Sequence, residues 1–212
     1  MNRTLIALAA SAALIGSLTA CGSQTDERVE PAASESVPAG VVEVPADEAS
    51  AIASAIASTP FVTIDCVSAQ VMPNDTAPQG TTIGSVTASL QPTGVPSITV
   101  GTDGTPATEL GVADVQEGSG AEVQPGDTVT VNYCGVGSGT QTLFDSSWAR
   151  GAPATFSLDQ VIAGWQQGVP GMKVGGTRLL VIPGELAYGE AGSSGILPNE
   201  TLAFVVELQA IG

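Results

Sequence analysis

The stretch that most suggests chemistry places two aliphatic residues and a tryptophan within five positions, as Val-Ile-Ala-Gly-Trp at residues 161–165. Glycines follow Trp165 and lead into an apolar run at residues 177–182. A tryptophan on one helical turn between strands can form the floor of a ligand pocket. It can equally be a core side chain that seals a sheet. The pattern alone leaves both interpretations open.

The chain has 212 residues and no histidine. This excludes Ser-His-Asp and Cys-His nucleophiles, histidine-containing zinc sites and the commonest general base. Chemistry must then rest on carboxylates, on a lysine, or on the environment that a pocket provides. We expect neither a metal nor a cofactor.

The net charge of the chain limits the classes of molecule that it can bind. Five Lys and Arg against 21 Asp and Glu give a net charge of −16, and the five cations are scattered. Without a basic stripe to neutralise phosphates, we expect no nucleic acid partner and no electrostatic attachment to anionic lipid. The acidic excess is typical of a soluble exported protein.

The first 20 residues have Arg3 followed by an apolar run of signal-peptide length, which is too short to span a membrane. They end in Leu-Thr-Ala before Cys21, which resembles the lipobox of bacterial lipoproteins. The resemblance implies a lipid on Cys21 and a protein held at the outer face of the cell membrane; an ordinary cleavage site beside a cysteine is the alternative. Residues 21–59 are rich in Ser, Ala, Glu and Pro, and we predict a flexible tether.

Residues 60–108 contain strand-like runs broken by Pro and Gly turns, but no motif. They are either a small β extension packed on the next domain or a poorly ordered segment. Cys66 lies in this region and Cys134 in the next. Because export permits disulfides, these two cysteines either form a bridge or remain as buried free thiols.

Residues 109–212 alternate apolar and polar side chains in several short runs, and only the stretch around Trp165 suggests a helix. The predicted strands are residues 112–117, 128–135, 144–147, 154–158, 177–182 and 201–211. One helix among so many strands indicates an α+β domain, with an antiparallel sheet wrapped on that helix.

Seven ordered blocks of this region resemble the FKBP family of peptidyl-prolyl isomerases, which bind macrolide immunosuppressants. They are residues 131–135, 144–147, 161–165, 171–176, 182–183, 186–189 and 202–208. The resemblance covers about half the chain. It implies a half-open antiparallel β-sheet wrapped around one short α-helix, and catalysis of X-Pro rotation.

The resemblance also implies a set of site residues. Trp165 would lie under the proline ring, the Ile162 amide would hold a peptide carbonyl, and Tyr188 would donate its hydroxyl to another. The implied catalytic residues are Tyr133, Asp145, Trp165, Tyr188 and Phe204; the implied substrate-binding residues are Phe144, Arg150, Phe156, Val161, Ile162, Ile196 and Leu197. Arg150 would pair with Asp145.

Two positions depart from the family. Ala154 stands at a pocket position that is often aromatic, and Ser193 stands where a histidine is common. We therefore expect isomerase activity with weak macrolide binding. The sequence predicts a monomeric enzyme that acts on proline-containing polypeptides and assists the folding of exported proteins. The alternatives are a proline-peptide-binding or chaperone module without turnover, and a lipoprotein whose function resides in residues 60–108.

Overall fold

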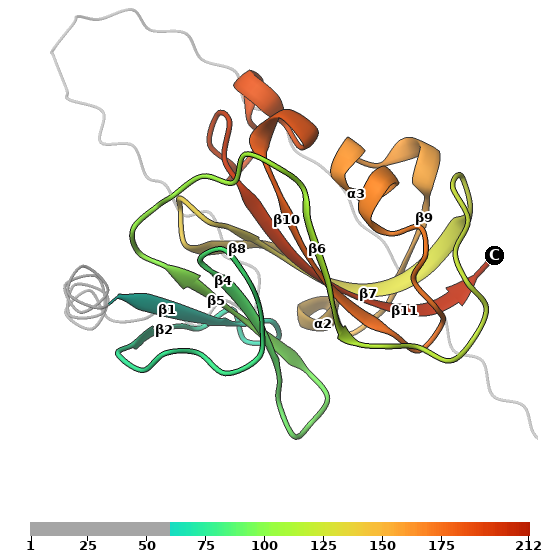
Figure 1. The fold of residues 1–212 in the computed structure, drawn as a ribbon, viewed down its shortest axis with the longest axis horizontal. Coiled ribbons are helices and arrows are strands. Elements are labelled where there is room, and N and C mark those ends of the chain that lie inside the picture. The colour runs from blue at the N-terminus through green and yellow to red at the C-terminus, as the bar shows by residue number, and fades with distance from the viewer. Residues whose placement is uncertain (1–59) are drawn as a thin grey trace, which may run out of the picture. The chain divides into compact units, whose positions relative to one another are not determined.

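The computed structural model describes residues 60–212 and folds them into two antiparallel sheets (Figure 1). The signal peptide, Cys21 and the tether predicted at 1–59 lie outside the described residues. None of the helices in residues 60–212 has the length and apolar character that a membrane-spanning helix needs.

The first sheet is built from strands between residues 61 and 101. For this region the sequence allowed either a β extension or a poorly ordered segment, and the structure has the β extension. Its strand order is β2-β1-β5-β4-β3. The strands are β1 (Phe61–Asp65), β2 (Val71–Asn74), β3 (Thr81–Ile83), β4 (Val86–Leu90) and β5 (Pro96–Gly101). Alternation decides the buried face, because Val62 and Ile64 are fully buried while the residue between them, Thr63, is only partly so.

The second sheet has the order β6-β10-β11-β7-β8, with β9 also paired to β7. Its strands are β6 (Gly111–Gln116), β7 (Thr128–Gly137), β8 (Thr142–Ser146), β9 (Ala154–Ser157), β10 (Thr177–Ile182) and β11 (Leu202–Ile211). They lie where alternation predicted strands, with ends that differ by at most two residues.

The helices are short. They are α2 (Ser147–Arg150), α3 (Ala163–Gly168) and the 3-10 turns η1 (Leu158–Gln160), η2 (Gly184–Leu186) and η3 (Gly189–Ala191). The helix α3 carries Trp165 as predicted. The prediction of a single helix was incomplete, because α2 has only four residues and is too short to leave a periodic signature in the sequence.

The C-terminal sheet buries both of its faces, and its side chains alternate between two cores. On β10, Leu180 and Ile182 face α3, whereas Leu179 and Val181 face the N-terminal sheet. Figure 1 shows strands β1 to β5 on one side of this sheet and α3 on the other. We call these the closed face, towards the N-terminal sheet, and the pocket face, towards α3.

A disulfide between Cys66 and Cys134 crosses the closed face. Both residues are fully buried among the aliphatic side chains that the two sheets share. Of the two states that the sequence left open for these cysteines, the structure has the bridge. The N-terminal sheet is therefore covalently attached to β7.

Candidate functional site

A cavity of about 340 Å³ opens on the pocket face. Strands β7, β8, β9 and β11, the helix α3 and the loops beside it supply its walls. The residues that line it are Tyr133, Phe144, Asp145, Phe156, Gln160, Val161, Ile162, Trp165, Tyr188 and Phe204. Apart from Asp145 and Gln160, each of them offers an aromatic or aliphatic surface.

Trp165 is the hub of the aromatic side chains. Its ring is edge-to-face with those of Tyr133, Phe156 and Phe204, at centroid distances of 5.7, 5.7 and 5.5 Å. Edge-to-face packing is the favoured geometry for aromatic rings. The indole is 4% exposed, and its N–H finds no acceptor within residues 60–212, so packing alone holds the ring.

Close packing against β10 sets the position of α3. A Cβ added to Gly164 would lie 2.4 Å from a methyl of Ile182, and one added to Gly168 would lie 2.7 Å from Leu180. Glycine is needed at both positions because the helix backbone lies directly on the strand. This contact brings the following side chain, Trp165, against the sheet.

Arg178 fixes the other end of α3. Its guanidinium is buried and donates to the carbonyl oxygens of Gly168 (2.8 Å) and Pro170 (3.2 Å). It also pairs with Asp114 of β6, with Nε and Oδ1 2.7 Å apart. The last carbonyls of a helix lack partners within the helix, so this side chain satisfies groups that would otherwise be unpaired.

A polar network stands at the rim of the cavity. The Tyr133 hydroxyl donates to Asp145, Arg150 forms an ion pair with Asp145, and the Arg150 Nη2 donates to the Tyr133 oxygen at 2.8 Å. The guanidinium also lies over the Tyr133 ring, 5.4 Å from its centroid. Burial raises the pKa of Tyr133, and the hydrogen bond to Asp145 raises it further. The hydrogen bond to Tyr133 raises the pKa of Arg150.

The Ile162 amide is available to a ligand. This residue precedes α3, and its carbonyl accepts from Trp165 and Gln166. Its own N–H has no acceptor within the described part of the chain. An amide at the wall of an apolar cavity is suited to bind a peptide carbonyl.

The loop between β10 and β11 brings Tyr188 to the cavity and leaves it 40% exposed. Glu200 holds the base of this loop, because its carboxylate accepts from the amides of Leu197 (2.8 Å) and Thr140 (2.6 Å). Ile196 is buried in the core beside the cavity, whereas Leu197 is 54% exposed. Ser193 pairs with Ile196 through the backbone.

Nine of the twelve residues predicted as catalytic or substrate-binding line the cavity. Ile196, Leu197 and Arg150 do not, although Arg150 binds two residues that do. Ala154, predicted at the pocket wall, is also absent from the lining and instead packs on the core, because its methyl group is short. Gln160 lines the cavity but was not predicted; its place just before Val161 was the only signal.

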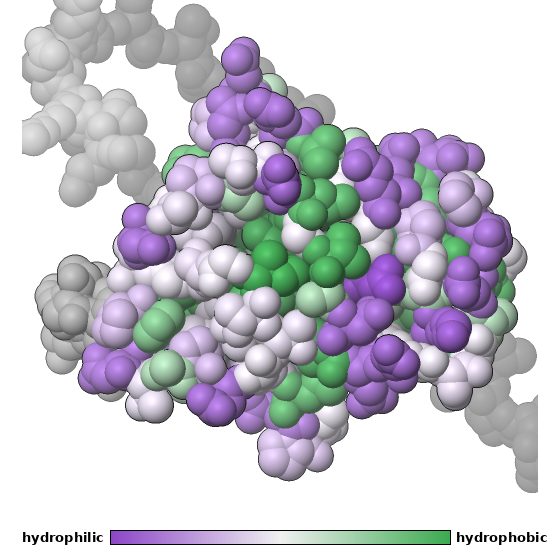
Figure 2. Space-filling view, viewed as in Figure 1, coloured by the Kyte–Doolittle hydropathy of each residue, from purple (hydrophilic) through white to green (hydrophobic). Residues whose placement is uncertain are grey.

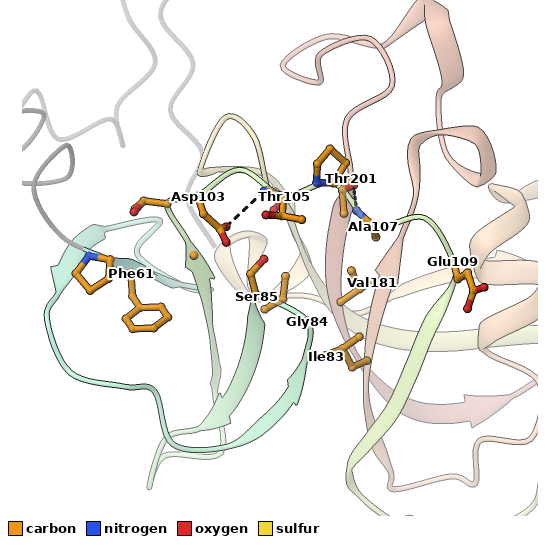
Figure 3. Close-up of a pocket in the computed structure, with 16 residues that line it drawn as sticks. Phe61, Ile83, Gly84, Ser85, Asp103, Thr105, Ala107, Glu109, Val181 and Thr201 are labelled. Atoms are coloured by element: carbon orange, nitrogen blue, oxygen red, sulfur yellow. Dashed lines mark hydrogen bonds between the residues drawn. The ribbon is translucent and has the colours of Figure 1, made fainter.

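A second cavity of about 780 Å³ lies between the two sheets (Figure 3). Ile83 and Val181 approach each other there from opposite sheets, and the Ala107 amide donates to Thr201 at 2.9 Å. Figure 2, drawn from the same side as Figure 1, shows apolar side chains gathered in the middle of the visible surface. Phe61 is the only aromatic side chain in the lining, so this cavity lacks the aromatic walls of the first.

Comparisons with known proteins find their similarity in the C-terminal half of the chain, which carries the pocket face. Residues 120–209 match the family described as FKBP-type peptidyl-prolyl cis-trans isomerase. An FK506-binding protein of Streptomyces anulatus is 52% identical over 112 residues, which are 51% of this chain and 90% of the relative.

A second relative is the FKBP-type peptidyl-prolyl cis-trans isomerase FkpA of Escherichia coli. It is 49% identical over 104 residues, which are 49% of this chain and 38% of the relative. The crystal structure of FkpA aligns with a TM-score of 0.46 at 48% identity, covering 49% of this chain and 48% of that one.

Proposed function

Because this chain belongs to the FKBP-type peptidyl-prolyl cis-trans isomerases, we propose that it catalyses X-Pro rotation in exported proteins by shielding the twisting amide from water. The isomerase activity is that of the family. Its substrates are proline-containing polypeptides. The exported clients, the role of each residue and the place of the enzyme in the cell are our proposal.

An apolar pocket suits this reaction. Rotation about the X-Pro bond breaks amide resonance and faces a barrier of about 18–20 kcal/mol. The twisted amide has lost its charge separation, so a site poor in water favours it over the planar amide. No nucleophile or proton transfer is required, and the absence of histidine does not hinder the reaction.

In this proposal the proline ring lies on Trp165, and Tyr133, Phe144 and Phe204 form the walls. The observation that carries the proposal is the edge-to-face packing that joins Trp165 to Tyr133 and Phe204, because it leaves a preformed apolar hollow.

Two groups hold the peptide on either side of the proline. The unpaired Ile162 amide binds the carbonyl that follows the proline, and the Tyr188 hydroxyl donates to a second carbonyl. Asp145, held by Tyr133 and Arg150, presents its carboxylate towards the twisting carbonyl. Together these contacts keep the peptide in place while the bond rotates.

A matched pair of phenylalanines tests the site. Phe204 lines the cavity, and Phe61 is the one phenylalanine that lies outside it. We expect the full chain to accelerate exchange of an X-Pro peptide, measured by NMR. Phe204→Leu should lower kcat/KM about tenfold, equivalent to about 1.4 kcal/mol, while Phe61→Leu should leave it unchanged. Equal effects of the two substitutions would contradict the assignment of the pocket.

We also propose that Cys21 carries the lipid that places the enzyme at the outer face of the cell membrane. The lipobox-like residues before Cys21 support this. Cells fed radioactive palmitate should label the wild-type chain in the membrane fraction, and Cys21→Ser should abolish both label and membrane retention. Unchanged labelling of the variant would reject the anchor.

We propose weak macrolide binding, because Ala154 leaves one side of the cavity without an aromatic wall. The measurement is a titration of tryptophan fluorescence with FK506 in the wild type and in Ala154→Phe. The substitution should tighten binding, and an equal affinity of the two proteins would contradict the role of Ala154.

A further inference from the structure

We propose that the N-terminal sheet positions Arg150 for isomerisation, and that Ser146 is the positioning residue through which it does so. This inference rests on the proposed role of the pocket. The path runs from Cys66 through Ser146 and α2 to Arg150, and each step is a contact in the structure.

The path begins where β7 and β8 present opposite faces side by side. Cys134 is paired with Ser146, and Gly135 with Asp145. Successive residues of a strand face opposite ways. Asp145 therefore lines the pocket, whereas Ser146 turns towards the N-terminal sheet.

Ser146 joins the N-terminal sheet to α2. Its hydroxyl donates to the Cys66 carbonyl at 2.6 Å and accepts from the Ala149 amide at 3.2 Å, which makes it the N-cap of the helix. The residue is 3% exposed. A helix of four residues has no independent stability, so its position depends on its cap and its packing.

Two kinds of contact hold the anchor at Cys66 in place. Its disulfide to Cys134 is fully buried. The turn that follows is held by Asp65, whose side chain accepts from the amides of Val67 (3.0 Å) and Ser68 (2.7 Å). The carbonyl that Ser146 binds is therefore fixed from both sides.

The far end of α2 delivers Arg150 to the pocket. Arg150 is the last residue of the helix, and Gly151 ends it with a φ of 71°. From there the guanidinium reaches Asp145 and the Tyr133 hydroxyl. A shift of α2 would move this cation away from two residues that line the cavity.

The N-terminal sheet lies outside residues 120–209, which match the family, whereas Ser146 and Arg150 lie inside them. The Streptomyces anulatus relative is matched over 90% of its own length by 112 residues of this chain, which leaves little room for a further sheet. We therefore expect the N-terminal sheet to adjust the rate of catalysis, not to create it.

A double-mutant cycle on the full chain tests the inference. Ser146→Ala removes the N-cap hydroxyl that holds α2, and we expect kcat/KM to fall about fivefold because Arg150 is then less well placed. Arg150→Met should also lower kcat/KM, and in that background Ser146→Ala should have no further effect. Such non-additivity is expected only if Ser146 acts through Arg150.

Two further variants separate positioning from folding. Ser146→Gly keeps a residue suited to an N-cap but removes the donor to Cys66, and it should lower kcat/KM as Ser146→Ala does. Thr99→Val removes a buried hydroxyl that bonds Thr63 at 2.9 Å within the N-terminal sheet. It should lower the urea midpoint and leave kcat/KM unchanged.

Equal effects of Ser146→Ala in the wild-type and Arg150→Met backgrounds would overturn the inference, because Ser146 would then act on the fold in general. So would a wild-type kcat/KM in Ser146→Gly. An Arg150→Met enzyme with full activity would overturn it as well. The assignment of the aromatic pocket is tested separately, by the Phe204→Leu and Phe61→Leu measurements.

Discussion

The strands β7, β10 and β11 of the C-terminal sheet carry side chains into two different cores, one on each face of the sheet. On the closed face, aliphatic side chains and a disulfide fill the space between two sheets. On the pocket face, large rings pack edge-to-face and leave a hollow of about 340 Å³. Branched aliphatic side chains interdigitate closely on the closed face, whereas on the pocket face the rings contact one another and line the cavity. Both faces therefore contribute to stability, but only the pocket face offers a cavity with aromatic walls.

The largest effect should come from the disulfide of the closed face. Cys66→Ala combined with Cys134→Ala removes a cross-link between residues 68 apart in sequence. By the loop-entropy relation, the free energy of unfolding should fall by about 4 kcal/mol. Urea denaturation measures this, with the reduced wild type as a control that should resemble the variant. A loss confined to kcat/KM would contradict the division between the faces.

Adjacent leucines on β10 give the sharpest test of the comparison. Leu179 and Leu180 are both fully buried, but they face opposite cores. Replacing either with alanine should lower the free energy of unfolding by about 3 kcal/mol. Leu180→Ala should also lower kcat/KM, because Leu180 supports α3 at Gly168, whereas folded Leu179→Ala should retain it. A reversed order of activities would refute the assignment.

A smaller effect is expected where α3 lies on β10. Gly164→Ala places a methyl group 2.4 Å from Ile182, so the helix must shift. Overpacking of this kind costs about 1–3 kcal/mol of stability. We also expect a lower kcat/KM, because Trp165 moves with the helix. Gln167→Ala, on the exposed side of α3, is the control, and an activity loss of equal size there would contradict this account.

The smallest effect concerns pH and Tyr133. Burial, followed by the hydrogen bond to Asp145, raises the pKa of this hydroxyl in the folded chain. The resulting stabilisation is complete below the unfolded value of about 10, and it is lost as the pH rises through the folded pKa. Ionisation of Tyr133 should therefore change the stability difference between wild type and Tyr133→Phe as the pH rises above about 10.

Spectrophotometry at high pH can follow this ionisation directly. The chain has two tyrosines, and Tyr133→Phe leaves only Tyr188 to titrate. The difference between the two titration curves belongs to Tyr133. Ionisation of Tyr133 at or below the ordinary tyrosine value would contradict the buried hydrogen bond.

Local patterns predicted much of the fold. Alternation located the strands of the C-terminal sheet, and the residues around Trp165 indicated the short helix. The contact between Cys66 and Ser146 could not be predicted in the same way, because the two residues are 80 apart in sequence. For residues 60–108 the sequence did not decide between a β extension and a poorly ordered segment. A local pattern does not show which surface a strand will pack against.

The site was predicted to a similar degree. The resemblance located the aromatic walls, since their blocks keep the family's order. It could not locate Gln160, a polar residue without a motif, and it placed Ala154 in the lining although a methyl group is too short to reach the cavity. Side-chain length and loop geometry decided both cases.

The place of β11 has a kinetic consequence. This strand, the last one described, lies between β10 and β7 and carries Phe204 into the cavity. Its partners on β7 lie about 70 residues earlier, as in the pairing of Tyr133 with Val206. Pairings this distant in sequence form slowly. The chain also has 14 prolines, and X-Pro rotation in an unfolded chain takes tens of seconds or longer. Any X-Pro bond of a newly made chain that starts in the non-native isomer must therefore undergo the same rotation that the finished pocket catalyses.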